Sequence, residues 1–120
     1  MLSENYNSMI LRGNYKGRTV LLTGDTSSGI LEKIDDNEHG TIRAEIYKNA
    51  HHNGKTTQAV LRLIKPLAAV ICNSGLPSAG YQKTFKKLGI KWYAACKRGG
   101  GNIIIKTNGK TWTVKKSKEE

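Results

Sequence analysis

A turn signal near the end of the chain constrains its fold more than any other segment does. Asn108-Gly109 separates two strand-like runs, and both residues tolerate the positive φ angles of a two-residue hairpin turn. Placing this pair at the turn sets Ile105 opposite Trp112, and directly opposed residues share a face. The predicted faces are Ile103, Ile105, Trp112 and Val114 on one side, and Ile104, Lys106, Thr111, Thr113 and Lys115 on the other.

The residues before this hairpin predict a helix. Ser78 is a typical N-cap residue, and Gly89 is typical of the position just past a helix end. Between them, Tyr81, Phe85 and Leu88 recur at helical spacing and form one apolar stripe. We expect this stripe to cover the apolar face of the hairpin.

Residues 90–97 alternate in a period of two and predict a strand, with 98–101 as the loop that leads into the hairpin. This arrangement gives a three-stranded antiparallel meander in which Ala94 pairs with Ile105. Residues 66–72 favour a short buried helix that starts at Pro66, and a fifth strand is the alternative.

Short apolar segments separated by turn residues fill the first half of the chain. The predicted strands are 19–23, 29–34, 41–47 and 57–64. Short strands that follow one another with turn residues between them are typical of a small antiparallel sheet. We therefore predict an α+β fold: an N-terminal antiparallel β-meander or half-barrel packed with a C-terminal helix and three-stranded meander.

The charge is divided sharply along the chain. The net charge is +11, from 20 basic and 9 acidic residues in 120, a length that suits one domain, 1–120. Residues 1–65 form a nearly neutral, β-rich half, whereas 66–118 form a strongly basic half with no acidic residue. A purely cationic half indicates a polyanionic partner, and solubility alone is the alternative explanation.

The candidate binding residues combine this charge with the predicted solvent-facing side of the meander. Tyr93 lies among the lysines of that face, where it could stack on an unpaired base. The glycines of 98–102 could form a nest of N–H groups for an anion, or simply a flexible loop. The phosphate- or nucleic-acid-binding set is Lys83, Lys86, Lys87, Lys91, Tyr93, Lys97, Arg98, Gly99, Gly100, Gly101, Asn102, Lys106, Lys110 and Lys115.

Catalytic and metal signals are weak. The chain has neither the Cys-x-x-Cys nor the His-x-x-x-His spacing that is typical of zinc ligands. Cys72 has apolar neighbours and no candidate base nearby, and turn carboxylates usually only initiate turns. We assign His39, His51 and His52 to surface loops. We therefore expect no catalytic residue, no metal and no cofactor.

These features predict a non-enzymatic protein that binds nucleic acid through residues 83–116. No apolar run approaches the roughly 20 residues that a membrane span needs, and no export signal is visible, so we expect a cytoplasmic protein without a membrane partner. The partner is a nucleic acid or a nucleotide phosphate, with an acidic protein surface as the alternative; a homo-oligomer is left open. The Lys-, Asn- and Ile-rich composition also suits a phage- or plasmid-type counter-defence protein that sequesters a nucleotide or inhibits an acidic-surfaced enzyme.

Overall fold

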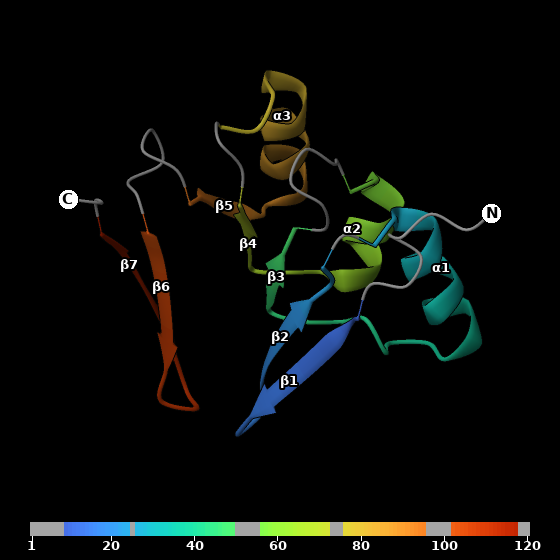
Figure 1. Ribbon diagram of the computed structural model, residues 1–120, viewed down its shortest axis with the longest axis horizontal. Helices are drawn as coiled ribbons and strands as arrows, with labels where there is room; N and C mark the ends of the chain where they lie inside the picture. Colours follow the sequence, from blue (N-terminus) through green and yellow to red (C-terminus); the bar gives the residue numbers. More distant parts are fainter. Residues whose placement is uncertain (1–8, 25, 50–55, 73–75, 96–101, 118–120) are drawn as a thin grey trace.

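A five-stranded sheet and a separate hairpin organise the chain (Figure 1). The computed structural model describes residues 9–24, 26–49, 56–72, 76–95 and 102–117. The elements are β1 (Leu11–Tyr15), β2 (Arg18–Leu22), α1 (Ser28–Asn37), β3 (Ile46–Lys48), α2 (Gln58–Ile64), β4 (Ala68–Ile71), α3 (Ala79–Leu88), β5 (Lys91–Ala94), β6 (Asn102–Thr107) and β7 (Trp112–Ser117).

The sheet has the order β1-β2-β3-β4-β5, so its strands follow one another as they do in the sequence. β1 is antiparallel to β2, whereas β2, β3, β4 and β5 are parallel. Each connection between two parallel strands passes through a helix. Because such crossovers are right-handed and the strand order advances in one direction across the sheet, all three helices lie on one face of the sheet. Figure 1 shows the β6–β7 hairpin on the other side of the sheet.

The core lies between the sheet and the three helices. The register aligns Leu21, Tyr47, Ala69 and Trp92 on the helix-facing side of adjacent strands. The first three are at most 1% exposed. They form one cluster with residues from each helix, including Leu31, Leu61 and Phe85.

The β6–β7 hairpin crosses the opposite face of the sheet. At one end, the Lys116 Nζ lies 5.8 Å from the centre of the Tyr93 ring on β5. At the other end, the Gly109 backbone lies so close to Lys16 that an added Cβ would meet the Lys16 Cδ at 2.6 Å. On the sheet face that points away from the helices, Ile46 and Ala68 are buried. The inward residues of the hairpin are half-buried: Ile103, Ile105, Trp112 and Val114.

Several sequence predictions for the second half are confirmed. The Ser78 Oγ accepts a hydrogen bond from the Tyr81 N–H at the start of α3, and Gly89 ends the helix with a φ of 72°. The predicted hairpin forms, and its inward and outward faces are those expected.

The hairpin register is shifted by two residues from the predicted one. Ile105 pairs with Val114 rather than Trp112. The cause is the turn, because the Asn108 Oδ1 accepts hydrogen bonds from the backbone N–H groups of Lys110 and Thr111 and so forms a longer loop. A shift of two residues preserves the faces, whereas a shift of one would exchange them.

The predicted three-stranded meander is wrong, because β5 pairs in parallel with β4 and not with β6. Ala94 lies opposite Ile71, where Ile105 was expected. The apolar stripe of α3 therefore packs on the helix side of the large sheet. The apolar face of the hairpin packs on the other side, so Trp112 does not lie under α3.

The fold mixes helices and strands as predicted, but the antiparallel meander of the first half is wrong. Segments 29–34 and 57–64 are not strands: they belong to α1 and α2. Two hydroxyls cap these helices, since the Ser27 Oγ accepts from the Ile30 N–H and the Thr57 Oγ1 from the Val60 N–H. The predicted strand 41–47 is reduced to β3, and 68–71 is the strand that was the alternative to a helix.

The two faces of the hairpin predict different mutational effects. Trp112→Ala should lower the free energy of unfolding by roughly 2 kcal/mol, less than for a fully buried ring, because the indole is half-buried. Thr113→Ala should cost well under about 1 kcal/mol, because this exposed side chain contributes mainly strand propensity. Urea denaturation of the two variants measures the difference. A larger loss for Thr113→Ala would mean that the two faces are exchanged.

Candidate functional site

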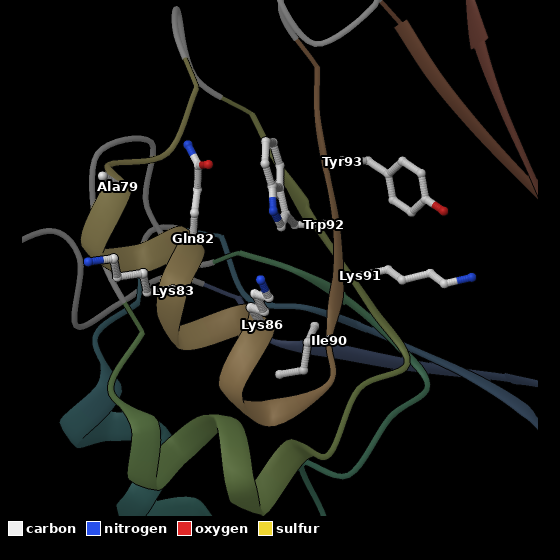
Figure 2. Close-up of a pocket in the computed structure, with 8 residues that line it drawn as sticks. All are labelled: Ala79, Gln82, Lys83, Lys86, Ile90, Lys91, Trp92 and Tyr93. Carbon is white, nitrogen blue, oxygen red and sulfur yellow. The ribbon is translucent and has the colours of Figure 1, made fainter.

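α3 and the edge strand β5 border an open groove of about 670 Å³ (Figure 2). A volume of this size falls in the range of small-ligand sites. The groove is lined by Ala79, Gln82, Lys83, Lys86, Ile90, Lys91, Trp92 and Tyr93.

The packing of α3 explains why lysines line this groove. Tyr81 and Phe85 are buried against the sheet, with their ring centres 4.3 Å apart. The helical period then turns Lys83 and Lys86 outward, where both are exposed. Lys86 also lies in the last turn of the helix, where a positive charge complements the helix dipole.

The pleat of β5 supplies the other wall. Trp92 points toward α3, whereas Lys91 and Tyr93 point to the opposite side of the strand (Figure 2). Trp92 is half-buried because one part of it packs on the core while the rest borders the groove. The groove therefore offers an aromatic surface between cationic side chains.

Four of the predicted binding residues meet at this groove: Lys83, Lys86, Lys91 and Tyr93. Sequence reasoning missed Gln82 and Trp92. Only the position of β5 at the sheet edge leaves part of the indole open, and no local sequence signal marks that position.

A second group of predicted residues lies on the outward face of the hairpin. Lys106, Lys115 and Thr113 are exposed there. Lys110 is exposed in the turn, and Asn102 is exposed at the start of β6. A small hollow of about 200 Å³ on this face is lined by Lys106, Thr107, Asn108, Thr111 and Thr113.

The single platform expected from the sequence is thus divided between two surfaces. Lys91 and Tyr93 belong to the large sheet, whereas Lys106 and Lys115 belong to the hairpin. Lys87 is exposed on α3 but does not line the groove. The predicted residues Lys97, Arg98, Gly99, Gly100 and Gly101 lie outside the described residues.

The lysines of both surfaces form no ion pair with the carboxylates that the structure describes. Within the described parts of the chain, Arg18 forms an ion pair with Glu45 at 3.1 Å, and the His39 Nδ1 lies 3.7 Å from the Asp35 carboxylate, both in the first half. The sequence places no carboxylate between 61 and 118 that could pair with a nearby lysine. Lys116 instead lies over the Tyr93 ring.

A buried polar cluster fixes the start of α3 to the end of β3. The Asn49 Oδ1 accepts hydrogen bonds from the Tyr81 hydroxyl at 2.5 Å and from the Thr56 hydroxyl at 3.2 Å. The Thr56 N–H donates to the Tyr81 oxygen, and the Tyr47 and Thr56 hydroxyls lie 2.7 Å apart. Burial raises the pKa of Tyr81 above its ordinary value of 10. This cluster orients the helix that carries Lys83 and Lys86.

Other chemistry finds little support in the described ranges. There, no three His, Cys, Asp or Glu side chains gather as a metal site would require. His51, His52 and Asp25 lie outside those ranges, and His39 is exposed.

Among the helices that can be described, none has the length and apolar character needed to cross a membrane. Comparison with protein-family models and with curated proteins finds no match to this chain.

Proposed function

We propose that this chain binds a polyanion, specifically a nucleic acid, as a non-enzymatic protein of the cytoplasm. The supporting observation is a set of exposed lysines on α3, β5 and the hairpin that form no ion pair among the described residues. They are Lys83, Lys86, Lys87, Lys91, Lys106, Lys110, Lys115 and Lys116.

Uncompensated lysines favour phosphate contact for a simple physical reason. Each phosphate that a lysine neutralises releases condensed counterions, and this release supplies most of the affinity of sequence-independent binding. Base-stacking aromatics add affinity for unpaired strands, and Trp92 and Tyr93 border the lysines of the groove. Charge and aromatic surface thus occur together on this side of the molecule.

The dependence of affinity on salt tests the proposal. For a single-stranded oligonucleotide, log K should fall linearly with log salt, with a slope of about −0.7 per phosphate neutralised. Replacing Lys106, Lys110 and Lys115 together with alanine should flatten that slope by about 2. Fluorescence anisotropy at several salt concentrations measures both slopes.

A matched variant controls for the loss of three charges anywhere on the molecule. Lys33, Arg43 and Arg62 are exposed cations that neither line the groove nor belong to the hairpin. Their triple alanine variant should keep the parental slope. Equal slopes for the two folded triple variants would contradict a role for the hairpin lysines, and a parent that binds no oligonucleotide would refute the function.

A further inference from the structure

Trp92 distinguishes the groove from the outward face of the hairpin. Both surfaces carry exposed lysines, but only the groove combines them with an indole held against the core. A side chain fixed in this way loses little further freedom when a ligand packs on it. The groove is therefore suited to a flat aromatic group that carries negative charge.

Gln82 gives the groove a directed polar group beside the indole. Its Nε2 donates a hydrogen bond to the Pro77 carbonyl oxygen at 2.8 Å, which fixes the orientation of the amide. The Oε1 then lies on the side of Trp92 (Figure 2). A carboxamide oxygen in this position can accept a hydrogen bond from the edge of a planar ring.

The cations lie around this aromatic and polar pair. Lys83 and Lys86 project from α3, and Lys91 projects from β5 on the far side of Trp92 (Figure 2). A ligand whose ring packs on Trp92 therefore meets the ammonium groups of Lys83 and Lys86 on the α3 wall of the groove, whereas Lys91 points to the other side of β5. Its negative charges must lie beside the ring, as the phosphates on the sugar of a nucleotide lie beside the base.

We propose that the groove binds one unpaired nucleotide. Its base packs on Trp92, a donor on the base edge bonds to the Gln82 Oε1, and its phosphates contact Lys83 and Lys86. This inference rests on the proposed function and specifies the strandedness of the ligand. A base in a duplex is paired and stacked on its neighbours, so it cannot enter the groove. The bound nucleic acid is therefore single-stranded at this point.

Tryptophan fluorescence can report the contact directly. The chain has two tryptophans, so Trp112→Phe leaves Trp92 as the only one. Titration with an octamer of deoxyadenosine should quench its emission to saturation. Two probes of equal length separate base from phosphate: an octamer with abasic sugars, and a blunt duplex of eight base pairs. Both should bind weakly and leave the emission unchanged.

Variants of the groove test the same contact through affinity, on the full chain with Trp112 retained. Trp92→Leu should weaken octadeoxyadenosine binding about 5- to 100-fold, the loss typical of one stacked base. It should leave the affinity for the abasic octamer unchanged. Trp92→Phe keeps an aromatic face and should recover most of the loss. Gln82→Met should weaken the octamer several-fold without changing the salt slope.

Each outcome distinguishes the inference from the function on which it rests. Equal affinity for normal and abasic octamers, without quenching, would overturn the nucleotide site and leave polyanion binding intact. No binding of any octamer would refute both, and preferential binding of polyglutamate would identify an acidic protein as the partner. If adenosine monophosphate quenches the Trp92 emission at the same concentrations as the octamer, the ligand is a free nucleotide. If it requires far higher concentrations, the ligand is a strand.

Discussion

Replacing Phe85 with alanine is expected to lower the free energy of unfolding by about 3–5 kcal/mol. Phe85 is completely buried between α3 and the sheet and contacts Tyr81 within the same helix. Truncation removes buried apolar surface and leaves a cavity, because the sheet below cannot collapse onto the shorter side chain. Chemical denaturation monitored by circular dichroism gives the free energy.

Lys87→Ala is the matched control, since this exposed residue lies two positions along the same helix. It should change stability by no more than about 0.5 kcal/mol. If the two variants were equally stable, α3 would not be anchored on the sheet through Phe85. Neither the groove wall nor the orientation of Lys83 and Lys86 would then follow from this packing.

The sequence predicted the elements whose local signals are strong. α3 has a capping serine, a terminal glycine and an apolar stripe, and the hairpin has alternation on both sides of an asparagine–glycine pair. These signals depend on residues close together in the chain. They therefore predict the element correctly whichever distant segments it packs against. The inward and outward faces of the hairpin were correct even though its register was shifted by two.

The topology of the first half could not be read in the same way. Strands buried on both faces have no alternation, and a short apolar run such as 57–64 suits a buried helix as well as a strand. Thr57, whose side chain caps α2, was placed at the start of a predicted strand, so its role as a helix cap was missed. Parallel pairing also depends on contacts between strands far apart in sequence, and no local turn specifies such contacts.

The candidate site was predicted as a set of residues but not as a shape. Lysines on the exposed sides of a helix and of strands follow from periodicity, so their exposure could be predicted. Their division into two surfaces follows from the pairing of β5 with β4, which the sequence does not reveal. The roles proposed for Trp92 and Gln82 depend on the groove that this pairing creates.

Replacing Asn49 with alanine is expected to lower the free energy of unfolding by about 2–3 kcal/mol, although the residue lies outside the groove. Asn49 is 1% exposed, and its carboxamide oxygen accepts from the hydroxyls of both Tyr81 and Thr56. Without it the buried Tyr81 hydroxyl loses the acceptor of its hydrogen bond. An Asn49→Ala variant as stable as the parent would mean that these hydrogen bonds do not stabilise the fold.

Measurements at alkaline pH distinguish the contribution of the Tyr81 hydroxyl to stability from the contribution of its packed ring. Its pKa is raised in the folded chain, chiefly because burial disfavours the phenolate. The stability that this group contributes is therefore complete below the unfolded pKa of about 10. It is lost as pH rises from there through the higher folded pKa, because only the unfolded chain then releases the proton. Tyr81→Phe keeps the ring and removes the proton, so its stability should fall less steeply above pH 10 than that of the parent. Parallel curves for the two proteins would mean that the phenol is not held protonated by the fold. Every other ionisable side chain is the same in the two proteins, so the difference between the two curves isolates the phenol.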